Sequence, residues 1–229
     1  MKKFKKIYMK RSAFTLIELI LVIVVLGILA AMAIPSYNRD LRQEAADNII
    51  SAIRYTKHMA LIDNKTDPRS KSYSSTGDWQ KSLWAIRFTV SSTDTDATYY
   101  TIATDENRNG SISKKEAAID PSNGKYFYNS SGSFASRASD ESPNIFIGHK
   151  YGIDSISFSG GCSNSNKHIA FDYFGRFHNG IGSATNDYAT YQNQDCNITL
   201  GFQSSSIDDI SIIVEKQTGH AYIDGQSDS

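Results

Sequence analysis

The segment DENRNGSISKKE, residues 105–116, carries oxygen-bearing side chains at the spacing of a calcium-binding loop. It fits the pattern D-x-[DN]-x-[DN]-G-x5-E without a mismatch. The oxygens would come from four side chains and one backbone carbonyl, those of Asp105, Asn107, Asn109, Glu116 and Ser111. Calcium is therefore the cofactor that this chain could take.

Further features of the same segment weaken the calcium interpretation. A predicted strand, residues 98–104, enters the loop where a calcium-binding helix–loop–helix unit has a helix. Only two of the ligands are charged, and Arg108, Lys114 and Lys115 lie in or beside the loop. The competing interpretation, which these features favour, is a solvated Asn-Gly turn that caps a short helix at residues 114–119. Any calcium affinity should be weak, with a dissociation constant of about 10⁻⁴ M or poorer.

A second chemically unusual residue is Glu18, the one charge in the 21-residue apolar run from Phe14 to Ile34. In a helix this run spans roughly 30 Å, the thickness of a membrane's hydrocarbon core. A carboxylate there costs about 2.5 kcal/mol or more and needs a cationic partner. Cleavage just before Phe14 would create an α-amine that could pair with Glu18 of a neighbouring copy. The alternative is a protonated glutamate tolerated near the membrane edge.

The charge distribution orients this run in a membrane. Residues 1–13 hold six of the 24 basic residues and no acid, so the rest of the chain has 18 bases and 24 acids. The positive-inside rule keeps residues 1–13 cytoplasmic and predicts that the chain beyond the run is translocated. AAMA at residues 30–33 imitates a signal-peptidase site, but the length of the run and Glu18 argue against an ordinary signal peptide.

The stretch FTLIELILVIVVLGILAAMAIPSYN, with the basic segment before it, resembles the N-terminus of type IV pilins and pseudopilins. The resemblance implies that a prepilin peptidase cuts after Ala13 and N-methylates Phe14. It makes Glu18 the acid of the assembly contact and Pro35 the helix-kinking proline. One departure is Ala13, which stands where the family usually has glycine; cleavage there is still expected, at lower efficiency.

Beyond Pro35 the helix should continue to about residue 62. Pro35 removes a helical hydrogen bond and Gly27 lowers helix propensity, so residues 27–35 should bend or loosen, unless Pro35 only marks the membrane exit. Apolar or small residues then recur every three or four positions, at Leu41, Ala45, Ile49, Ile53, Thr56 and Ala60. This spacing predicts a helix with one face laid on a β-sheet.

Residues 63–229 read as a β-rich globular domain. Strands are predicted at residues 83–90, 98–104, 144–148, 153–158, 168–174, 197–202, 210–215 and 220–223, separated by turn residues. Long loops are expected at residues 121–143 and 175–195. The fold class is therefore α+β: a pilin fold in which a long N-terminal helix packs on a mostly antiparallel sheet.

Three later segments extend the resemblance: HIAFDYFGRFHNG, CNITLGF and ISIIVEKQTGHAYI. They look like the C-terminal sheet of the H-type minor pseudopilins of type II secretion and of FimT-type minor pilins. In that pattern the last hairpin turns at a Thr-Gly such as Thr218-Gly219. The match is less specific than the N-terminal one, because hairpins with glycine turns are common.

Cys162 and Cys196 are the only cysteines and lie in the part predicted to be translocated, an oxidising setting. A disulfide between them would close a loop of about 35 residues and stabilise the fold by roughly 3–4 kcal/mol in the chain-entropy model. The alternative is two separate buried thiols.

The sequence carries no nucleophile-and-base arrangement, phosphate loop or histidine pair at metal-ligand spacing, so we do not expect an enzyme. Two rival functions fit parts of the chain. A DNA-uptake minor pilin would need a basic patch, for which Arg137, Lys150 and Arg176 are candidates, although the net negative body makes nucleic acid an unlikely partner. A membrane-anchored calcium-binding domain that never polymerises is the second.

The favoured interpretation is a minor pilin or pseudopilin of a type II secretion or type IV pilus filament. Its predicted parts are a cleaved leader (1–13), a transmembrane and assembly helix (14–35), an amphipathic continuation (36–62) and a periplasmic domain (63–229). The resemblance implies a single-pass protein of the bacterial inner membrane that later joins a filament. Its partners would be other pilins, prepilin peptidase, the inner-membrane assembly platform and membrane lipid.

Overall fold

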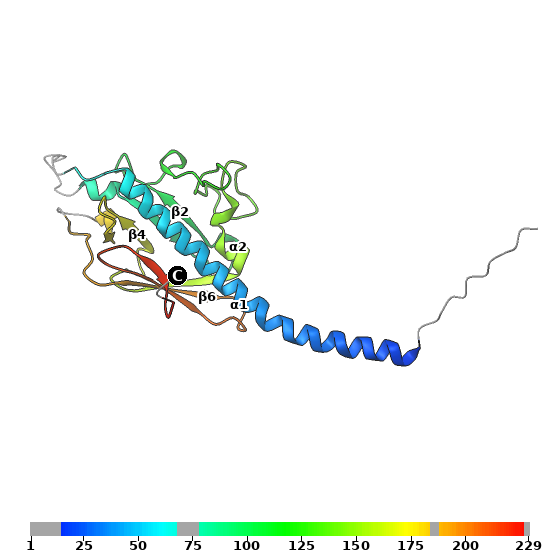
Figure 1. The fold of residues 1–229 in the computed structure, drawn as a ribbon. Helices are drawn as coiled ribbons and strands as arrows, with labels where there is room; N and C mark the ends of the chain where they lie inside the picture. Colours follow the sequence, from blue (N-terminus) through cyan, green and yellow to red (C-terminus); the bar gives the residue numbers. More distant parts are fainter. Residues whose placement is uncertain (1–14, 68–77, 184–187, 227–229) are drawn as a thin grey trace, which may run out of the picture. The chain divides into compact units, whose positions relative to one another are not determined.

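The computed structural model describes residues 15–67, 78–183 and 188–226, with the backbone alone for residues 33–40 (Figure 1). The chain forms two compact units that meet between Asp40 and Leu41. Helix α1, Leu16–Ile62, begins in the first unit and ends in the second. Its helical backbone continues through position 35, and the predicted loosening of residues 27–35 stays a prediction.

The second half of α1 buries the face that the sequence periodicity predicts. Ala45, Ile49, Ile53 and Thr56 are fully buried, and Ala60 is nearly so. Because the hydroxyl of Thr56 donates to the carbonyl oxygen of Ala52 at 2.8 Å, its polar atom is satisfied inside the helix. The amphipathic face is thus confirmed.

The first of two antiparallel sheets has the strand order β2-β1-β4-β5. Its members are β1 (Trp84–Thr89), β2 (Tyr99–Ala103), β4 (His168–Phe171) and β5 (Phe177–His178). In the central pair Ile86 lies opposite Ile102 of β2 and Ile169 of β4. These three fully buried side chains point into the main core.

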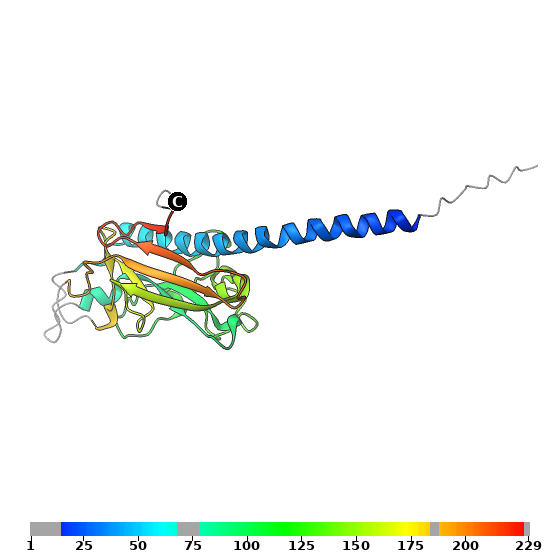
Figure 2. The ribbon, with the colours of Figure 1, turned by 90° about the horizontal axis from the view of Figure 1, so that it is seen from below.

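The second sheet has the order β3-β6-β7-β8 and is also antiparallel. Its members are β3 (Ile153–Gly160), β6 (Cys196–Phe202), β7 (Ile210–Val214) and β8 (Ala221–Ile223). The edge strand β8 lies beside α1, where Arg54 Nη2 donates to the carbonyl oxygen of Ala221 at 3.0 Å (Figure 2). The helix therefore covers an edge that would otherwise present unpaired backbone groups.

One continuous core joins α1 to both sheets. Its buried members include Ile49 and Ile53 of the helix, Phe171 of the first sheet, and Ile198 and Ile212 of the second. A long helix packed on antiparallel sheets is the predicted α+β fold, which the structure confirms.

The predicted strand at residues 144–148 is wrong. The chain there forms a 3₁₀ turn, η4 (Pro143–Ile145), followed by a short helix, α2 (Ile147–Tyr151). The hydroxyl of Ser142 caps the turn, and Gly152 in the left-handed conformation ends the helix. The run of buried apolar residues resembled a strand because periodicity cannot distinguish a short buried helix from a buried strand.

The predicted strand at residues 168–174 ends three residues early, and β5 was not predicted. The chain turns at residues 172–175, where Gly175 has φ +78° and its N–H donates to the carbonyl oxygen of Asp172. Three further short 3₁₀ turns lie in loops: η2 (Thr95–Ala97), η3 (Lys114–Glu116) and η5 (Ile181–Ser183).

A second, smaller core lies on the outer face of the first sheet. The 3₁₀ helix η1 (Asp78–Ser82) places Trp79 against Leu83, Ala85, Ala170 and Ile181. Trp79 is only 2% exposed. The segment that leads into β1 thus supplies a buried anchor that covers the sheet.

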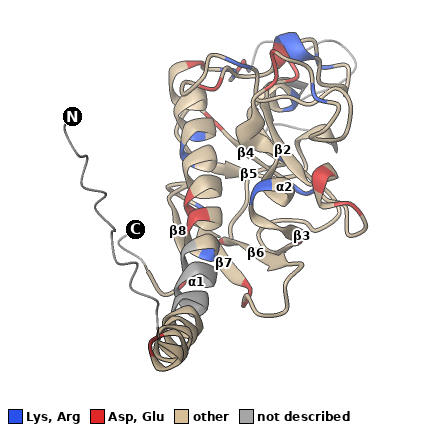
Figure 3. Ribbon diagram, turned by 90° about the vertical axis from the view of Figure 1, so that its right-hand side faces the viewer, with Lys and Arg blue, Asp and Glu red and all other residues tan. Residues whose placement is uncertain are grey.

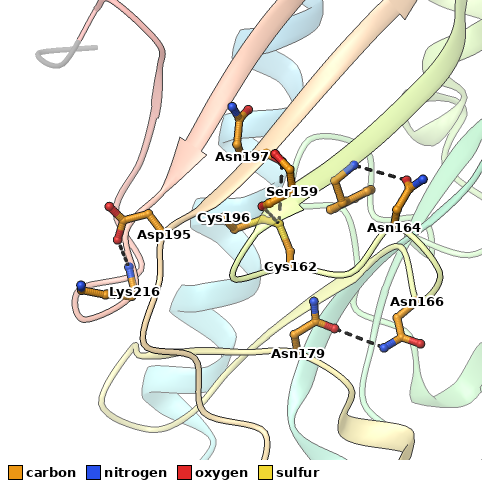
Figure 4. The surroundings of a disulfide bond; sticks show 10 residues. Ser159, Cys162, Asn164, Asn166, Asn179, Asp195, Cys196, Asn197 and Lys216 are labelled. Carbon is orange, nitrogen blue, oxygen red and sulfur yellow. Dashed lines mark hydrogen bonds between the residues drawn. A yellow bond between two sulfur atoms is a disulfide. The ribbon is translucent and has the colours of Figure 1, made fainter.

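The predicted disulfide between Cys162 and Cys196 is present in the structure (Figure 4). Cys196 opens β6 opposite Gly160, the last residue of β3, so the bond clamps the end of an existing strand pair. Beside it the backbone N–H of Lys216 donates to Asp195 Oδ1 at 3.0 Å. The disulfide therefore fixes the chain where the long loop after β5 re-enters the sheet.

Asp172 places a buried carboxylate in the turn between β4 and β5, with a side chain that is 1% exposed. Its Oδ2 accepts from Arg176 Nε at 2.7 Å and lies 3.2 Å from His178 Nε2, while Oδ1 accepts from two backbone N–H groups. Burial raises the pKa of Asp172, but the bonds from His178 and Arg176 outweigh it and the pKa lies below its ordinary value. The ionised carboxylate is thus the organising centre of this turn.

We expect Asp172→Asn to lower the free energy of unfolding by about 2 kcal/mol at pH 7, because it removes charge-assisted hydrogen bonds. Since the folded-state pKa is depressed, the contribution is full above the ordinary carboxyl pKa of about 3.9 and is lost as the pH falls through the folded value. Urea unfolding of the full chain in detergent, from pH 7 to pH 3, measures this. Asp208→Asn, a side chain 94% exposed, is the control and should change nothing; an equal deficit for Asp172→Asn at pH 7 and pH 3 would contradict the assignment.

Candidate functional site: the N-terminal helix and the 105–116 loop

Thr15 and Glu18 form a reciprocal hydrogen-bonded pair at the start of α1. The backbone N–H and the hydroxyl of Thr15 both donate to Glu18 Oε2 at 2.9 Å, and the N–H of Glu18 donates to the Thr15 hydroxyl at 3.3 Å. This is a capping box, which satisfies backbone N–H groups that a helix leaves unpaired at its N-terminus. The sequence interpretation missed Thr15, although Thr-x-x-Glu before an apolar run is the signal for such a cap.

The capping box leaves the carboxylate of Glu18 able to accept a further hydrogen bond. Both bonds from Thr15 go to Oε2, and no described residue donates to Oε1. The positive end of the helix dipole lies at this turn and stabilises a carboxylate there. One carboxylate can therefore cap its own helix and still receive a donor from outside the chain.

The first part of α1 exposes an apolar surface on every side. Twelve large apolar residues between Leu16 and Leu29, and Met32, are each 46–76% exposed in the single chain. Figure 3 shows this part of α1 almost without charge, whereas both acidic and basic residues lie along its second half. Such a surface marks a binding region for lipid or protein, because soluble monomers rarely expose apolar patches of this extent.

Several predicted residues of this region fall outside what the structure describes. Ala13 and Phe14 lie before the first described residue, and Pro35 is described only through its helical backbone. Of the helices, as far as they are described, none is both long and apolar enough to cross a membrane. The processing site and the assembly contact therefore remain predictions.

The loop of residues 105–116 folds around its own polar side chains. Asp105, 3% exposed, accepts from the N–H of Asn109 at 3.1 Å and from the N–H of Gly110 at 2.8 Å. The side-chain oxygens of Asn107 and Asn109 each accept from the backbone N–H two residues on. The side-chain oxygens of Asp105, Asn107 and Asn109, three of the predicted calcium ligands, thus each already accept a hydrogen bond from the loop backbone.

Glu116 closes the loop. Its Oε2 accepts from the N–H and hydroxyl of Ser113, at 2.9 and 2.7 Å, and its Oε1 accepts from Asn107 Nδ2 at 2.9 Å. The bond from the Ser113 N–H is the main cause that lowers the pKa of Glu116, and partial burial opposes it. The N–H of Thr104 also donates to the Glu116 carbonyl at 3.1 Å, so the two ends of the loop are joined.

This arrangement fits a metal only in part. Glu116 would have to exchange its bonds from Ser113 and Asn107 for a cation. Ser111, the predicted backbone ligand, is exposed. Within the described ranges, no three His, Cys, Asp or Glu side chains lie together as metal ligands. The helix expected at residues 114–119 is only the 3₁₀ turn η3. Calcium binding stays a prediction.

The three basic residues proposed for a nucleic-acid patch are each engaged within the fold. Arg137 lies over the Phe134 ring, 4.1 Å from its centre. Lys150 pairs with Glu44 at 2.9 Å, and the Arg176 Nη2 pairs with Asp172. Two of the three charges are thus paired with carboxylates inside the fold, whereas Arg137 is stacked on an aromatic ring and keeps its charge.

Residues 8–34 match the family model of the prokaryotic N-terminal methylation motif. The motif covers the predicted processing site, Glu18 and the whole apolar run, and it supports a type IV pilin-like subunit that prepilin peptidase processes and that is anchored in a membrane. It indicates a structural subunit that assembles with other pilins. No solved structure matches the chain.

Proposed function

We propose that this protein is a minor pilin or pseudopilin that is stored in the bacterial inner membrane and assembles into a filament through α1. The leader, residues 1–13, is removed, and Phe14 becomes the methylated first residue. Residues 14–35 hold the subunit in lipid and later in the filament core, and residues 36–62 carry the β-rich domain of residues 63–229 on the outside.

The observation that carries this proposal is the contrast between the two halves of α1. In its second half the apolar face is buried in the domain, so this part of the helix is already satisfied. In its first half the apolar side chains are exposed on all sides of the single chain. These residues lie within the segment that matches the methylation motif. A helix of this kind is stable only when other apolar matter, lipid or neighbouring helices, surrounds it.

Processing is tested by mass spectrometry of the protein purified from a bacterium that expresses prepilin peptidase. We expect a mature chain that starts at Phe14 and carries one methyl group on its α-amine. Ala13→Gly should raise the processed fraction, because glycine is the residue usual in the resembled family at this position. An intact Met1, or a chain cut after Ala33, would contradict the proposal.

Assembly rests on pairing between Glu18 and the α-amine of Phe14 in a neighbouring subunit. A carboxylate without a partner costs free energy in lipid. Glu18 and the α-amine of Phe14 are therefore more stable in the membrane as a pair than apart. The geometry of the capping box supports this, since it leaves Oε1 of Glu18 without a donor from any described residue. Repetition of one such contact by a screw operation generates an open helical filament.

We expect Glu18→Gln to be processed normally yet to enter filaments at least tenfold less than the wild type, because the amide keeps an acceptor for Thr15 but loses the charge. Thr15→Ala is the matched control: it removes the donor hydroxyl of the cap and leaves the carboxylate. Quantitative immunoblots of sheared filament fractions measure both. Equal incorporation of Glu18→Gln and wild type would contradict the assembly role and would show that Glu18 acts only as a helix cap.

Among the possible filaments we propose the type II secretion pseudopilus or a type IV pilus, in the role of an H-type or FimT-like subunit. The second sheet supports this, since β6, β7 and β8 follow in order and the last hairpin turns at Gly219 with φ +62°. A Cβ on Gly219 would lie 2.3 Å from the carbonyl oxygen of Gly175, so only glycine fits there. A DNA-uptake role remains the alternative, tested by salt-dependent DNA binding.

For the loop of residues 105–116 we propose a calcium-independent turn that closes on its own side chains. In support, every predicted side-chain ligand accepts a hydrogen bond from within the loop, and Arg87 and Arg108 line the same region. A calcium site of weak, extracellular type is the alternative outcome.

Accordingly, 1 mM Ca²⁺ should leave the melting temperature of the full chain in detergent unchanged relative to EDTA. Glu116→Gln should destabilise the fold by about 1–2 kcal/mol in both buffers, because it weakens the bonds from Ser113. Glu106→Gln, its exposed neighbour, is the control. A saturable rise in melting temperature with Ca²⁺, not given by Mg²⁺ and abolished by Glu116→Gln, would restore the calcium site.

A further inference from the structure

The exposed residues Asn109 and Gly110 of the 105–116 loop form one of three Asn-Gly dipeptides in the chain. The others are at residues 123–124 and 179–180, and Asn179 is buried. In such a dipeptide the backbone nitrogen of glycine can attack the side-chain amide carbon of asparagine, because glycine has no Cβ to obstruct closure of a five-membered ring. The structure gives these dipeptides different surroundings.

The attacking atom at the first dipeptide is the backbone nitrogen of Gly110, and it faces a carboxylate. Its N–H donates to Asp105 Oδ2 at 2.8 Å. The other carboxylate oxygen, Oδ1, accepts from the N–H of Asn109 at 3.1 Å, so the side chain of Asp105 is held against both reacting residues. A carboxylate within hydrogen-bond distance of the proton that must leave is placed as a general base.

The atom under attack is Cγ of Asn109, and its carbonyl group is polarised. Asn109 Oδ1 accepts from the backbone N–H of Ser111 at 2.8 Å. This bond folds the side chain back over the Gly110 peptide nitrogen, and it places a donor on the oxygen that gains negative charge during the attack. Among the described residues, none accepts a hydrogen bond from Asn109 Nδ2, so the leaving nitrogen is not held.

The dipeptide Asn123-Gly124 is also exposed but has no such base. Its Oδ1 accepts from the N–H of Lys125 at 2.9 Å, which is the same polarising contact. The N–H of Gly124, however, donates to the backbone carbonyl oxygen of Asp120 at 2.8 Å, and a carbonyl oxygen is a far weaker base than a carboxylate. Asn123 Nδ2 is also held, by Asp120 Oδ2 at 3.0 Å and by the hydroxyl of Ser142 at 3.1 Å.

We propose that Asn109 is a site of self-modification, at which the fold converts this asparagine to aspartate or isoaspartate through a succinimide. The Gly110 nitrogen gives its proton to Asp105 and bonds to Cγ of Asn109. The bond from Cγ to Nδ2 then breaks, and Nδ2 takes the proton from Asp105 and leaves as ammonia. One water molecule opens the ring, so the net reaction consumes water and releases ammonia without any other reactant.

The aspartate product changes the charge of the loop. It is a third carboxylate among the predicted calcium ligands, in addition to Asp105 and Glu116. Loops of this type bind calcium more tightly as the number of charged ligands increases. Conversion at position 109 would therefore favour a cation in a loop that is closed by its own hydrogen bonds when first folded.

Peptide mass spectrometry of the full chain in detergent, incubated in EDTA at physiological pH and temperature, measures the conversion of each asparagine. We expect Asn109 to convert about tenfold faster than Asn123 in the same molecules, because only the Gly110 N–H faces a carboxylate. In urea the two dipeptides should convert at similar rates, since the contacts of the fold are lost. EDTA keeps the result independent of any calcium at the loop.

Asp105→Asn tests the base directly, because it keeps a side-chain acceptor for the Gly110 N–H and removes the carboxylate. It should slow conversion at Asn109 about tenfold and leave Asn123 unchanged. If this variant unfolds, both of its rates will match those in urea, and the ratio of the two rates in the native wild type decides alone. Equal rates at Asn109 and Asn123 in the native wild type would overturn the proposal, as would an unchanged rate at Asn109 in folded Asp105→Asn.

Discussion

The burial of one face of α1 against both sheets is the constraint on which the rest of this structure depends. Each sheet has four short strands, and neither could bury its apolar face alone. The helix supplies a straight row of small and branched side chains, from Ala45 through Ile49 and Ile53 to Ala60, over which both sheets close. Because the side chains of this row are small, the helix lies close to the strands. Arg54 can then reach β8 and donate to the carbonyl oxygen of Ala221.

The sequence predicted the elements that have a clean period. The 3.6-residue spacing from Leu41 to Ala60 located the buried helical face, and alternating strands such as β6 and β7 were found within a residue or two of their ends. The sequence-based prediction failed where proline, glycine or a capping side chain sets the local structure despite the spacing of the apolar residues. Pro143 and Gly152 bound a short helix inside an apolar run, and Gly175 breaks one expected strand into a hairpin.

The functional residues divide in the same manner. Glu18 stood out because a charge in an apolar run violates a simple energetic rule, and the calcium-like loop stood out because its spacing is regular. Thr15 did not stand out, because its Thr-x-x-Glu signal lies inside the apolar run, where Glu18 had already been interpreted as an intermolecular contact. A threonine becomes a cap only once the helix start is known, and the structure places that start beside Thr15.

The return of the chain end to the helix has a mechanical consequence. Gln226 hydrogen-bonds Gln43, and Ala221 receives Arg54, so the last strand lies along the helix almost from its entry into the domain. A pull on the N-terminal side of Leu41, along the helix axis, would load these bonds and the Lys150–Glu44 pair in shear, so that they resist together. These contacts add to the buried apolar face of the helix, so a displacement of the helix along its axis would break several of them at once.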